Sequence, residues 1–168
     1  ALETAHGAKG RVEPVPTDGD YSIFIDYAVT PDAIENVLTT LRGIAPKRLV
    51  MLFGAGGDRD RKKRPIMGKL SADIADFVIV TSDNPRTEDP MSIIEEILPG
   101  VRAGKAPYKV ICDRPEAIRW AIDHHEPGDV ILLCGKGHED YQIIGHEKIH
   151  MDEREIVADY LAERAKRT

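Results

Sequence analysis

Short apolar runs rich in β-branched residues alternate with helix-length segments along this chain of 168 residues, and the alternation limits the folds open to it. Expected strands cover residues 11–15, 21–26, 48–53, 77–81, 108–111 and 129–134. Expected helices cover residues 31–42, 65–75, 90–98, 114–125 and 153–166. Strands that alternate with helices of this length form βαβ units. We therefore predict an α/β, Rossmann-like domain with a mostly parallel sheet, helices on both faces, and a short hairpin over residues 141–150.

Capping residues mark where several of these helices start. Thr30 is an N-cap residue, and it precedes Pro31, whose fixed φ suits the first helical position. Asp113 and Asp152 are each followed three residues later by a glutamate, which is the spacing of a capping box. The helix that starts at Pro31 carries one apolar face, formed by Ile34, Val37, Leu38 and Leu41.

Four of the expected strands end in polar loops, which follow Asp26, Phe53, Thr81 and Cys134. Right-handed crossovers place the carboxyl ends of parallel strands along one edge of a sheet. Open α/β sheets bind their ligands at that edge. We therefore predict that the four polar loops converge on one site.

The loop after Thr81 carries the most informative set of charged groups. Asp83 offers acceptor oxygens to an ammonium, and Arg86 offers a planar fork of donors to a carboxylate. Pro85 fixes the backbone between them, so that both side chains can face one ligand. This arrangement suits a zwitterion, such as the end of an amino acid. The same residues also fit a polar turn into a helix capped by Asp89, and spacing alone does not separate the two interpretations.

Two glycine-rich loops lack the common nucleotide-binding motifs. The first has two glycines of a dinucleotide fingerprint, at Gly54 and Gly56, but Arg59 stands at its sixth position. The second is no P-loop, because Val130 stands where the leading glycine should be and Gly137 where Ser or Thr should hold magnesium. Neither a nicotinamide site nor a phosphate loop of that kind is expected.

A basic block at residues 59–64 lies inside an otherwise acidic chain. Lys62 and Lys63 are expected on a solvated face. Arg59 closely follows a strand end, where its guanidinium could grip a carboxylate or a phosphate. On the loop after Cys134, Glu139 could accept from an ammonium, although it also fits an ordinary loop carboxylate.

The composition argues against several classes of partner. The net charge of −6 does not favour nucleic acid or an anionic membrane as the main partner. No apolar run approaches the roughly 20 residues that span a bilayer. The first residues also lack the features of a signal peptide, so a cytoplasmic location is expected.

Reactive residues show no pattern that identifies a catalytic centre. Cys112 and Cys134 are far apart and are expected to be free thiols. His124, His125 and the spaced His146 and His150 lack a third ligand at metal spacing, so they are expected on the surface. No nucleophile elbow is present. We therefore assign no catalytic residue and no metal site.

Four motifs together resemble a known family. They read, in order, DYAVTPDAIENVLTTLR, FGAGGDRDRKKRPIMG, SDNPRTEDP and GKGHEDYQIIG. Their order and separation are similar to those in the carboxyl-terminal domain of the Mur ligases, from about Gly10 to the end of the chain. The intact DNPR motif resembles that of the members that add meso-diaminopimelate, whereas lysine-adding relatives differ there. The resemblance implies that residues 11–168 form this domain and that residues 1–10 are a linker from a central domain.

The resemblance also implies roles for individual residues. The residues implied to hold the incoming amino acid are Arg59, Asp83, Asn84, Arg86, Gly135 and Glu139. Arg11 and Asp26 are implied to contact the ribose of ATP. The family usually has histidine where this chain has Val29, a departure that concerns the nucleotide side of the match and not the amino acid side.

The activity implied by the resemblance is ATP-dependent addition of meso-diaminopimelate to UDP-N-acetylmuramoyl-L-alanyl-D-glutamate, through an acyl phosphate, in peptidoglycan synthesis. ATP and Mg²⁺ are implied to be held mostly by the central domain, so this domain alone is expected to be inactive. Two other interpretations stay open. One is a domain of a sister ligase, of the folylpolyglutamate or cyanophycin synthetase type, and the other is a non-catalytic module that binds a nucleotide or an amino acid.

Overall fold

The computed structural model describes residues 8–44 and 46–168, so the linker expected over residues 1–10 lies outside the described residues except for its last three. In this part of the chain, six strands form the main sheet in the order β1-β2-β6-β3-β4-β5, and a second sheet pairs β7 with β8. The strands are β1 (Glu13–Val15), β2 (Tyr21–Asp26), β3 (Arg48–Phe53), β4 (Phe77–Val80), β5 (Tyr108–Val110), β6 (Asp129–Cys134), β7 (Tyr141–Ile144) and β8 (Glu147–His150). The helices are α1 (Pro31–Arg42), α2 (Lys63–Ile74), α3 (Pro90–Ala103), α4 (Arg114–Asp123) and α5 (Glu153–Lys166).

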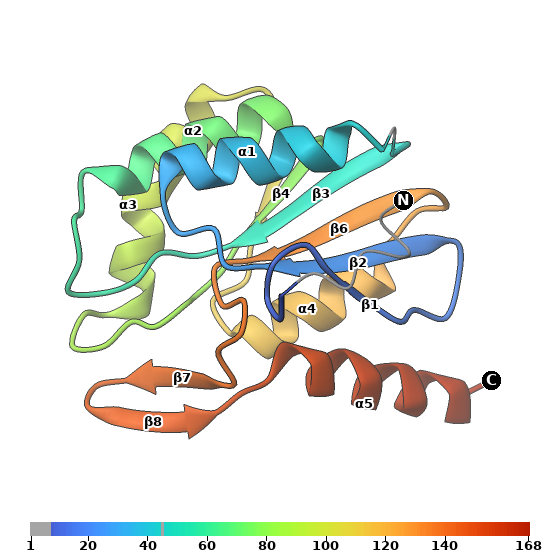
Figure 1. Ribbon diagram of the computed structural model, residues 1–168. Coiled ribbons are helices and arrows are strands. Elements are labelled where there is room, and N and C mark those ends of the chain that lie inside the picture. The colour runs from blue at the N-terminus through green and yellow to red at the C-terminus, as the bar shows by residue number, and fades with distance from the viewer. Residues whose placement is uncertain (1–7, 45) are drawn as a thin grey trace.

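Helices cover both faces of the main sheet, as Figure 1 shows, with α1, α2 and α3 on one face and α4 and α5 on the other. Only β1 is antiparallel to its neighbour among these six strands. Successive strand residues point to opposite faces, so in β6 Leu132 joins the core under α1–α3 and Leu133 joins the core under α4 and α5. Central strands are apolar at nearly every position for this reason. The predicted α/β, Rossmann-like architecture is confirmed.

The local signals of α1 set its boundaries as predicted. The hydroxyl of Thr30 accepts a hydrogen bond from the backbone N–H of Ala33 at 3.2 Å, and Pro31 occupies the first helical position. Its four predicted apolar residues are all buried in the core. Burial of an aliphatic side chain of this size is worth roughly 1.5–3 kcal/mol, so one face of α1 suffices to hold it on the sheet.

Helix α3 continues to Ala103, five residues beyond the predicted end at Leu98. Pro99 lies inside the helix, where it removes one backbone donor. The turn after Pro99 is stabilised by packing, because Gly100 and Val101 are buried against α2. A Cβ at Gly100 would overlap the backbone carbonyl of Pro65. Tertiary contact with α2 therefore outweighs the local cost of the proline.

Other boundaries differ by a few residues. Strand β1 starts at Glu13 instead of residue 11, because Val12 adopts a left-handed backbone conformation with φ of 42° that ends the extended run. Helix α2 starts at Lys63 instead of residue 65, and α4 ends at Asp123 instead of residue 125.

The hairpin of β7 and β8 forms as predicted and projects away from the main sheet (Figure 1). It is attached to the loop after β4 through the backbone of Arg86. The N–H of Arg86 donates to the carbonyl of Ile143 at 3.1 Å, and the N–H of Gly145 donates to the carbonyl of Arg86 at 2.7 Å. This pairing links two segments that are far apart in sequence.

Three predictions about individual groups can be compared with the described residues. Cys112 and Cys134 are free thiols, as predicted. His124, His146 and His150 are exposed, but His125 is only half-exposed because its ring stacks on Tyr21 with 3.8 Å between centroids. Over residues 8–44 and 46–168, no helix is both long and apolar enough to cross a membrane.

Candidate functional site

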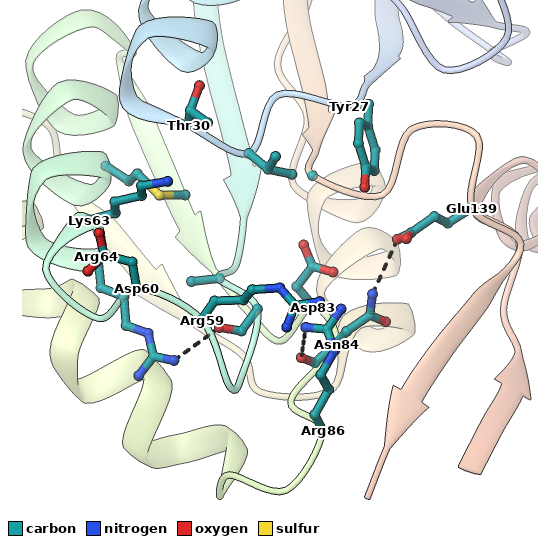
Figure 2. Close-up of a pocket in the computed structure, with 15 residues that line it drawn as sticks. Tyr27, Thr30, Arg59, Asp60, Lys63, Arg64, Asp83, Asn84, Arg86 and Glu139 are labelled. Carbon is teal, nitrogen blue, oxygen red and sulfur yellow. Dashed lines mark hydrogen bonds between the residues drawn. The ribbon is translucent and has the colours of Figure 1, made fainter. Parts of the chain in front are cut away.

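The four polar loops converge on a cavity of about 240 Å³ at the carboxyl edge of the sheet, as predicted (Figure 2). The chain leaves β3 toward α2 on one face of the sheet and leaves the adjacent β6 toward α5 on the other face, and such a switch point opens a crevice. All six residues implied to hold an amino acid line the cavity. The lining residues are Tyr27, Val29, Thr30, Ala55, Gly56, Arg59, Asp60, Lys63, Arg64, Met67, Asp83, Asn84, Arg86, Gly135 and Glu139.

Direct backbone contact joins the loops after β3 and β4. The N–H of Gly57 donates to the carbonyl of Asn84 at 2.8 Å, and the Arg86 guanidinium donates to the carbonyl of Gly57 at 3.0 Å. Only glycine fits at position 57, because a Cβ there would overlap the carbonyl of Pro85. Arg86 has a positive φ of 52°, a conformation held by its two backbone hydrogen bonds to the hairpin. In Figure 2 the guanidinium groups of Arg59 and Arg86 turn toward the space beside Asp83.

A fully buried lysine, which the sequence analysis did not assign, lies behind these groups. The Nζ of Lys136 donates to Oδ1 of Asn84 at 2.7 Å, and it lies 3.1 Å from a carboxylate oxygen of Glu139 and 3.7 Å from one of Asp83. Its side chain is 0% exposed. The available signal was a lysine two residues after a strand that is apolar from Val130 to Cys134, since a lysine next to a buried strand can itself be buried and then requires anionic partners.

Of the three carboxylates that line the cavity, Asp83 and Glu139 are buried and Asp60 is exposed. Burial raises the pKa of Asp83 above its ordinary value near 3.8, and the cationic groups of Arg114 and Lys136 offset part of that effect. Glu139 accepts hydrogen bonds from the amide of Asn84 at 3.3 Å and from the hydroxyl of Tyr141 at 3.1 Å. Each buried carboxylate is thus held in place by a neighbour on another segment.

Arg114, at the start of α4, is a second unassigned residue that shapes the site. Its guanidinium donates to the carbonyls of Ser82 at 3.0 Å and Cys134 at 2.9 Å, and it pairs with Glu153 at 2.9 Å. It therefore ties the ends of β4 and β6 to α5. Gly135, the residue after Cys134, has a φ of 112°, and a Cβ there would lie 2.7 Å from an oxygen of Asp83.

The basic block at residues 59–64 is divided between solvent and interior. Arg59 is exposed and faces the cavity, and Lys62 is exposed as predicted. The prediction of a solvated face is wrong for Lys63, which is half-buried and lines the cavity because α2 begins at this residue. Arg64 is 1% exposed, and it donates to Glu88, Glu96 and the carbonyl of Gly56.

The comparison with known proteins decides the family. A family model described as "Mur ligase, glutamate ligase domain" matches residues 10–137. The chain belongs to the Mur ligase family. The resemblance to the carboxyl-terminal domain of these ligases is therefore confirmed.

The most similar relatives of this Mur ligase domain share one name, UDP-N-acetylmuramoyl-L-alanyl-D-glutamate--2,6-diaminopimelate ligase. The protein of Caldanaerobacter subterraneus subsp. tengcongensis is 54% identical over 158 residues, which are 94% of this chain and 33% of that protein. The protein of Trichormus variabilis is 54% identical over 168 residues, 99% of this chain and 34% of that protein. A solved structure of a ligase with this name has a TM-score of 0.86 and 40% identity, and the match covers 95% of this chain and 32% of that one. The chain thus spans about a third of the length of these relatives.

Arg11 and Asp26, implied for ATP in the Mur ligase domain, do not line the cavity. Arg11 is exposed, and Asp26 is half-buried with one carboxylate oxygen 2.9 Å from the N–H of Val12, which donates to it. Burial raises the pKa of Asp26. Val29 lines the cavity itself and is 42% exposed.

The Mur ligase cavity contains groups that can pair with both the negative and the positive charge of a small zwitterion. Guanidinium groups of Arg59 and Arg86 can pair with carboxylates, while Asp83 and Glu139 can accept from an ammonium. Over residues 8–44 and 46–168, no group of three or more His, Cys, Asp and Glu side chains has the arrangement of a metal site.

Proposed function

We propose that this chain is the amino-acid-binding C-terminal domain, residues 11–168, of an ATP-dependent ligase that adds meso-diaminopimelate to UDP-N-acetylmuramoyl-L-alanyl-D-glutamate in the cytoplasm. The proposal depends on one observation: two guanidinium groups and two carboxylates, supplied by three loops, face a single cavity. Diaminopimelate carries an amino acid group at each end, and this charge pattern matches it. The names of the most similar relatives support the same substrate.

Each end of diaminopimelate has its own partners in this proposal. The end that does not react places its carboxylate against Arg86 and the amide of Asn84, and its ammonium against Asp83, Glu139 and the carbonyl of Gly135. The carboxylate of the other end pairs with Arg59, which leaves the adjacent amine free to attack. Lysine lacks one carboxylate and leaves Arg86 without its ligand partner, which is the physical basis for rejecting it.

The reaction consists of two steps. ATP transfers its γ-phosphoryl group to the glutamate carboxylate, and the free amine of diaminopimelate then attacks the acyl phosphate, so that a C–N bond forms and inorganic phosphate leaves. We assign most of the binding of ATP and Mg²⁺ to a central domain that residues 1–10 join to this one, and we assign contacts with the ribose to Arg11 and Asp26. This domain contributes by positioning the amine and by closing the site against water.

Calorimetric titration of the 168-residue chain tests the substrate. We expect meso-diaminopimelate to bind more tightly than L-lysine or L-glutamate, the amino acid that a folylpolyglutamate-type ligase would prefer. Arg86→Ala should weaken diaminopimelate binding roughly 10- to 150-fold, because a hydrogen bond to a charged group is worth about 1.5–3 kcal/mol. Arg119→Ala, which removes an exposed arginine on α4, is the matched control and should leave affinity unchanged. Equal affinity for all three amino acids would count against the proposal.

Catalysis requires more than this domain. We expect no diaminopimelate-dependent hydrolysis of ATP by the purified chain, whereas the complete ligase should show it. Release of phosphate by the 168-residue chain in a coupled assay would overturn the assignment of ATP to a central domain. It would leave the assignment of the amino acid site untouched.

A further inference from the structure

Lys136 is a fully buried charge beside the cavity, and its contacts with the site residues have not yet been given a role. It lies between two glycines directly after β6, and its side chain is 0% exposed. Burying an ammonium is costly unless anions and hydrogen bonds compensate for the lost water. Glu139 and Asp83 supply the anions, and Asn84 supplies the shortest contact, at 2.7 Å. The lysine is therefore held in one position.

The contacts of Asn84 determine how its amide is oriented. The ammonium of Lys136 and the backbone N–H of Ile143, which lies 2.9 Å from the same atom of Asn84, can only donate. The atom that both contact must accept, so it is the oxygen, and both of its lone pairs are used. The amide nitrogen then faces Glu139 at 3.3 Å, as Figure 2 shows, and keeps one N–H for a ligand. Asn84 can therefore donate to a ligand carboxylate, and it cannot accept from a ligand ammonium.

Charged groups from several segments lie around Lys136 and its partner Asp83. Asp83 on the loop after β4 and Glu139 on its own loop lie near the ammonium, while Arg114 of α4, paired with Glu153 of α5, acts on Asp83. The ring of Tyr141 lies 5.3 Å from the ammonium. Lys136 contacts the side-chain amide of Asn84, whereas Arg86 donates to the backbone carbonyl of Asn84 at 3.5 Å. The guanidinium of Arg114 bonds to Glu153 and to two backbone carbonyls instead. Three described contacts fix the amide: the N–H of Ile143 and Lys136 donate to its oxygen, and Glu139 accepts from its nitrogen. Lys136 makes the shortest of the three and supplies the charged donor.

We propose that Lys136 is a positioning residue that fixes the amide of Asn84 with its N–H toward the cavity and thereby makes the site selective for a ligand with a second carboxylate. This inference rests on the proposed function, because the ligand carboxylate to which Asn84 donates is the one that diaminopimelate has and lysine lacks. Lys136 acts through Asn84 and does not touch the ligand itself.

Side-chain NMR tests the orientation without any ligand. The chain has two asparagines, Asn36 and Asn84, so asparagine labelled with ¹⁵N at the amide gives two NH₂ groups. Asn36 is exposed on α1 and serves as an internal reference. We expect the Asn84 NH₂ protons to exchange with water at least 10-fold more slowly than those of Asn36. Saturating meso-diaminopimelate should shift the Asn84 signals, and saturating L-lysine should not.

Two variants separate positioning from folding. Lys136→Met keeps the length of the side chain and removes its charge, while Lys148→Met removes an exposed lysine whose Nζ lies 4.0 Å from the centroid of the same Tyr141 ring. We expect Lys136→Met to shift the Asn84 signals in the free protein and to reduce the preference for diaminopimelate over lysine at least 10-fold. Lys148→Met should change neither. A merely structural role for Lys136 would weaken both ligands equally.

Each outcome decides one claim. A Lys136→Met variant that keeps the wild-type preference, or lysine shifting Asn84 as strongly as diaminopimelate, overturns the inference. Should Lys136→Met fail to fold, an Asn84 amide in the wild-type chain that exchanges as fast as Asn36 also overturns it. Failure of the wild-type chain to bind any of the amino acids overturns the proposed function instead, and the ligand-free exchange experiment still reports on the contact between Lys136 and Asn84.

Discussion

At the scale of single residues, Arg64 is a buried charge in a basic segment whose composition predicts exposure to solvent. Its guanidinium is 1% exposed, and it donates to Glu88 at 2.7 Å, to Glu96 at 2.6 Å and to the carbonyl of Gly56 at 3.0 Å. The partners come from α3 and from the loop before it, so the arginine fastens the glycine-rich loop of the cavity to a neighbouring layer. Sequence spacing gives no information about such distant partners.

The lowered pKa of Glu88 predicts how the stability of the fold depends on pH. The hydrogen bond from Arg64 and the N–H of Asp58 hold the pKa of Glu88 at about 2, below its ordinary value near 4.5. A lowered pKa means that the folded state binds the proton less well than the unfolded state. The stabilisation by Glu88 is therefore complete above pH 4.5 and is lost as the pH falls toward 2.

Urea unfolding of Glu88→Gln at several pH values tests this prediction. At pH 7 the variant should be about 1.5–3 kcal/mol less stable than the wild type, the value of a hydrogen bond to a charged group. The difference should shrink at pH 3 and vanish near pH 2. Glu35→Gln makes the same charge change at an exposed site of α1 and should show no such dependence. A difference in stability that stays constant from pH 7 to pH 2 would contradict the assignment.

At the scale of elements, α3 shows that packing can extend a helix beyond its local stop signal. A proline in a helix interior usually breaks the helix, but α3 continues through Pro99 and Gly100 because Gly100 lets α3 approach α2 closely. Gly68 on α2 has the matching role, since a Cβ there would lie 3.1 Å from the backbone nitrogen of Val101. The two glycines thus set the separation of the helices.

Gly100→Ala should be destabilising although alanine is the better helix former. Alanine gains up to about 1 kcal/mol of helix propensity over glycine. Its methyl group would overlap the carbonyl of Pro65, and forcing packed helices apart costs typically 1–3 kcal/mol. We therefore expect a net loss of stability in urea unfolding. Gly19→Ala is the control, because its Cβ would make only ordinary contact with Tyr21, and a Gly100→Ala variant as stable as the wild type would refute the close approach.

At the scale of the molecule, one buried arginine joins strands and helices at the carboxyl edge of the sheet. Arg114 and Glu153 are 0% and 1% exposed, and the arginine also bonds to the ends of β4 and β6. One oxygen of Glu153 has no hydrogen-bond partner among the described residues. The pair therefore joins α4 to α5 and holds the ends of β4 and β6, including the start of the loop that carries Asp83. It does so although one oxygen of the buried carboxylate lacks a partner.

A double-mutant cycle tests this arrangement. Arg114→Met should lower the free energy of unfolding by about 3–5 kcal/mol, because it leaves a buried carboxylate unpaired. Adding Glu153→Leu should restore part of that loss, since a buried ion pair can be replaced by apolar side chains at little cost. Recovery stays incomplete because the carbonyls of Ser82 and Cys134 still lack their donor. A double variant no more stable than Arg114→Met alone would argue against the pairing.

Features that depend on neighbouring residues could be predicted from the amino-acid sequence. Apolar periodicity and caps such as Thr30 predicted the strands, most helix starts and the Rossmann-like architecture, because these signals act within a few residues. Parallel strands and right-handed crossovers then implied that Arg59, Asp83, Arg86 and Glu139 would meet at one edge, and they do. The family motifs located the same residues.

Which charges are buried, and which groups they contact, became known from the folded arrangement of the elements. Lys136, Arg64 and Arg114 read as ordinary basic residues in the sequence, yet each is buried among partners on other elements, such as Glu153, which is 39 residues from Arg114. The structure likewise separated Arg11 and Asp26 from the cavity and carried α3 past its proline. Burial of a charge depends on whether distant segments bring it compensating groups, and that information exists only once the chain has folded.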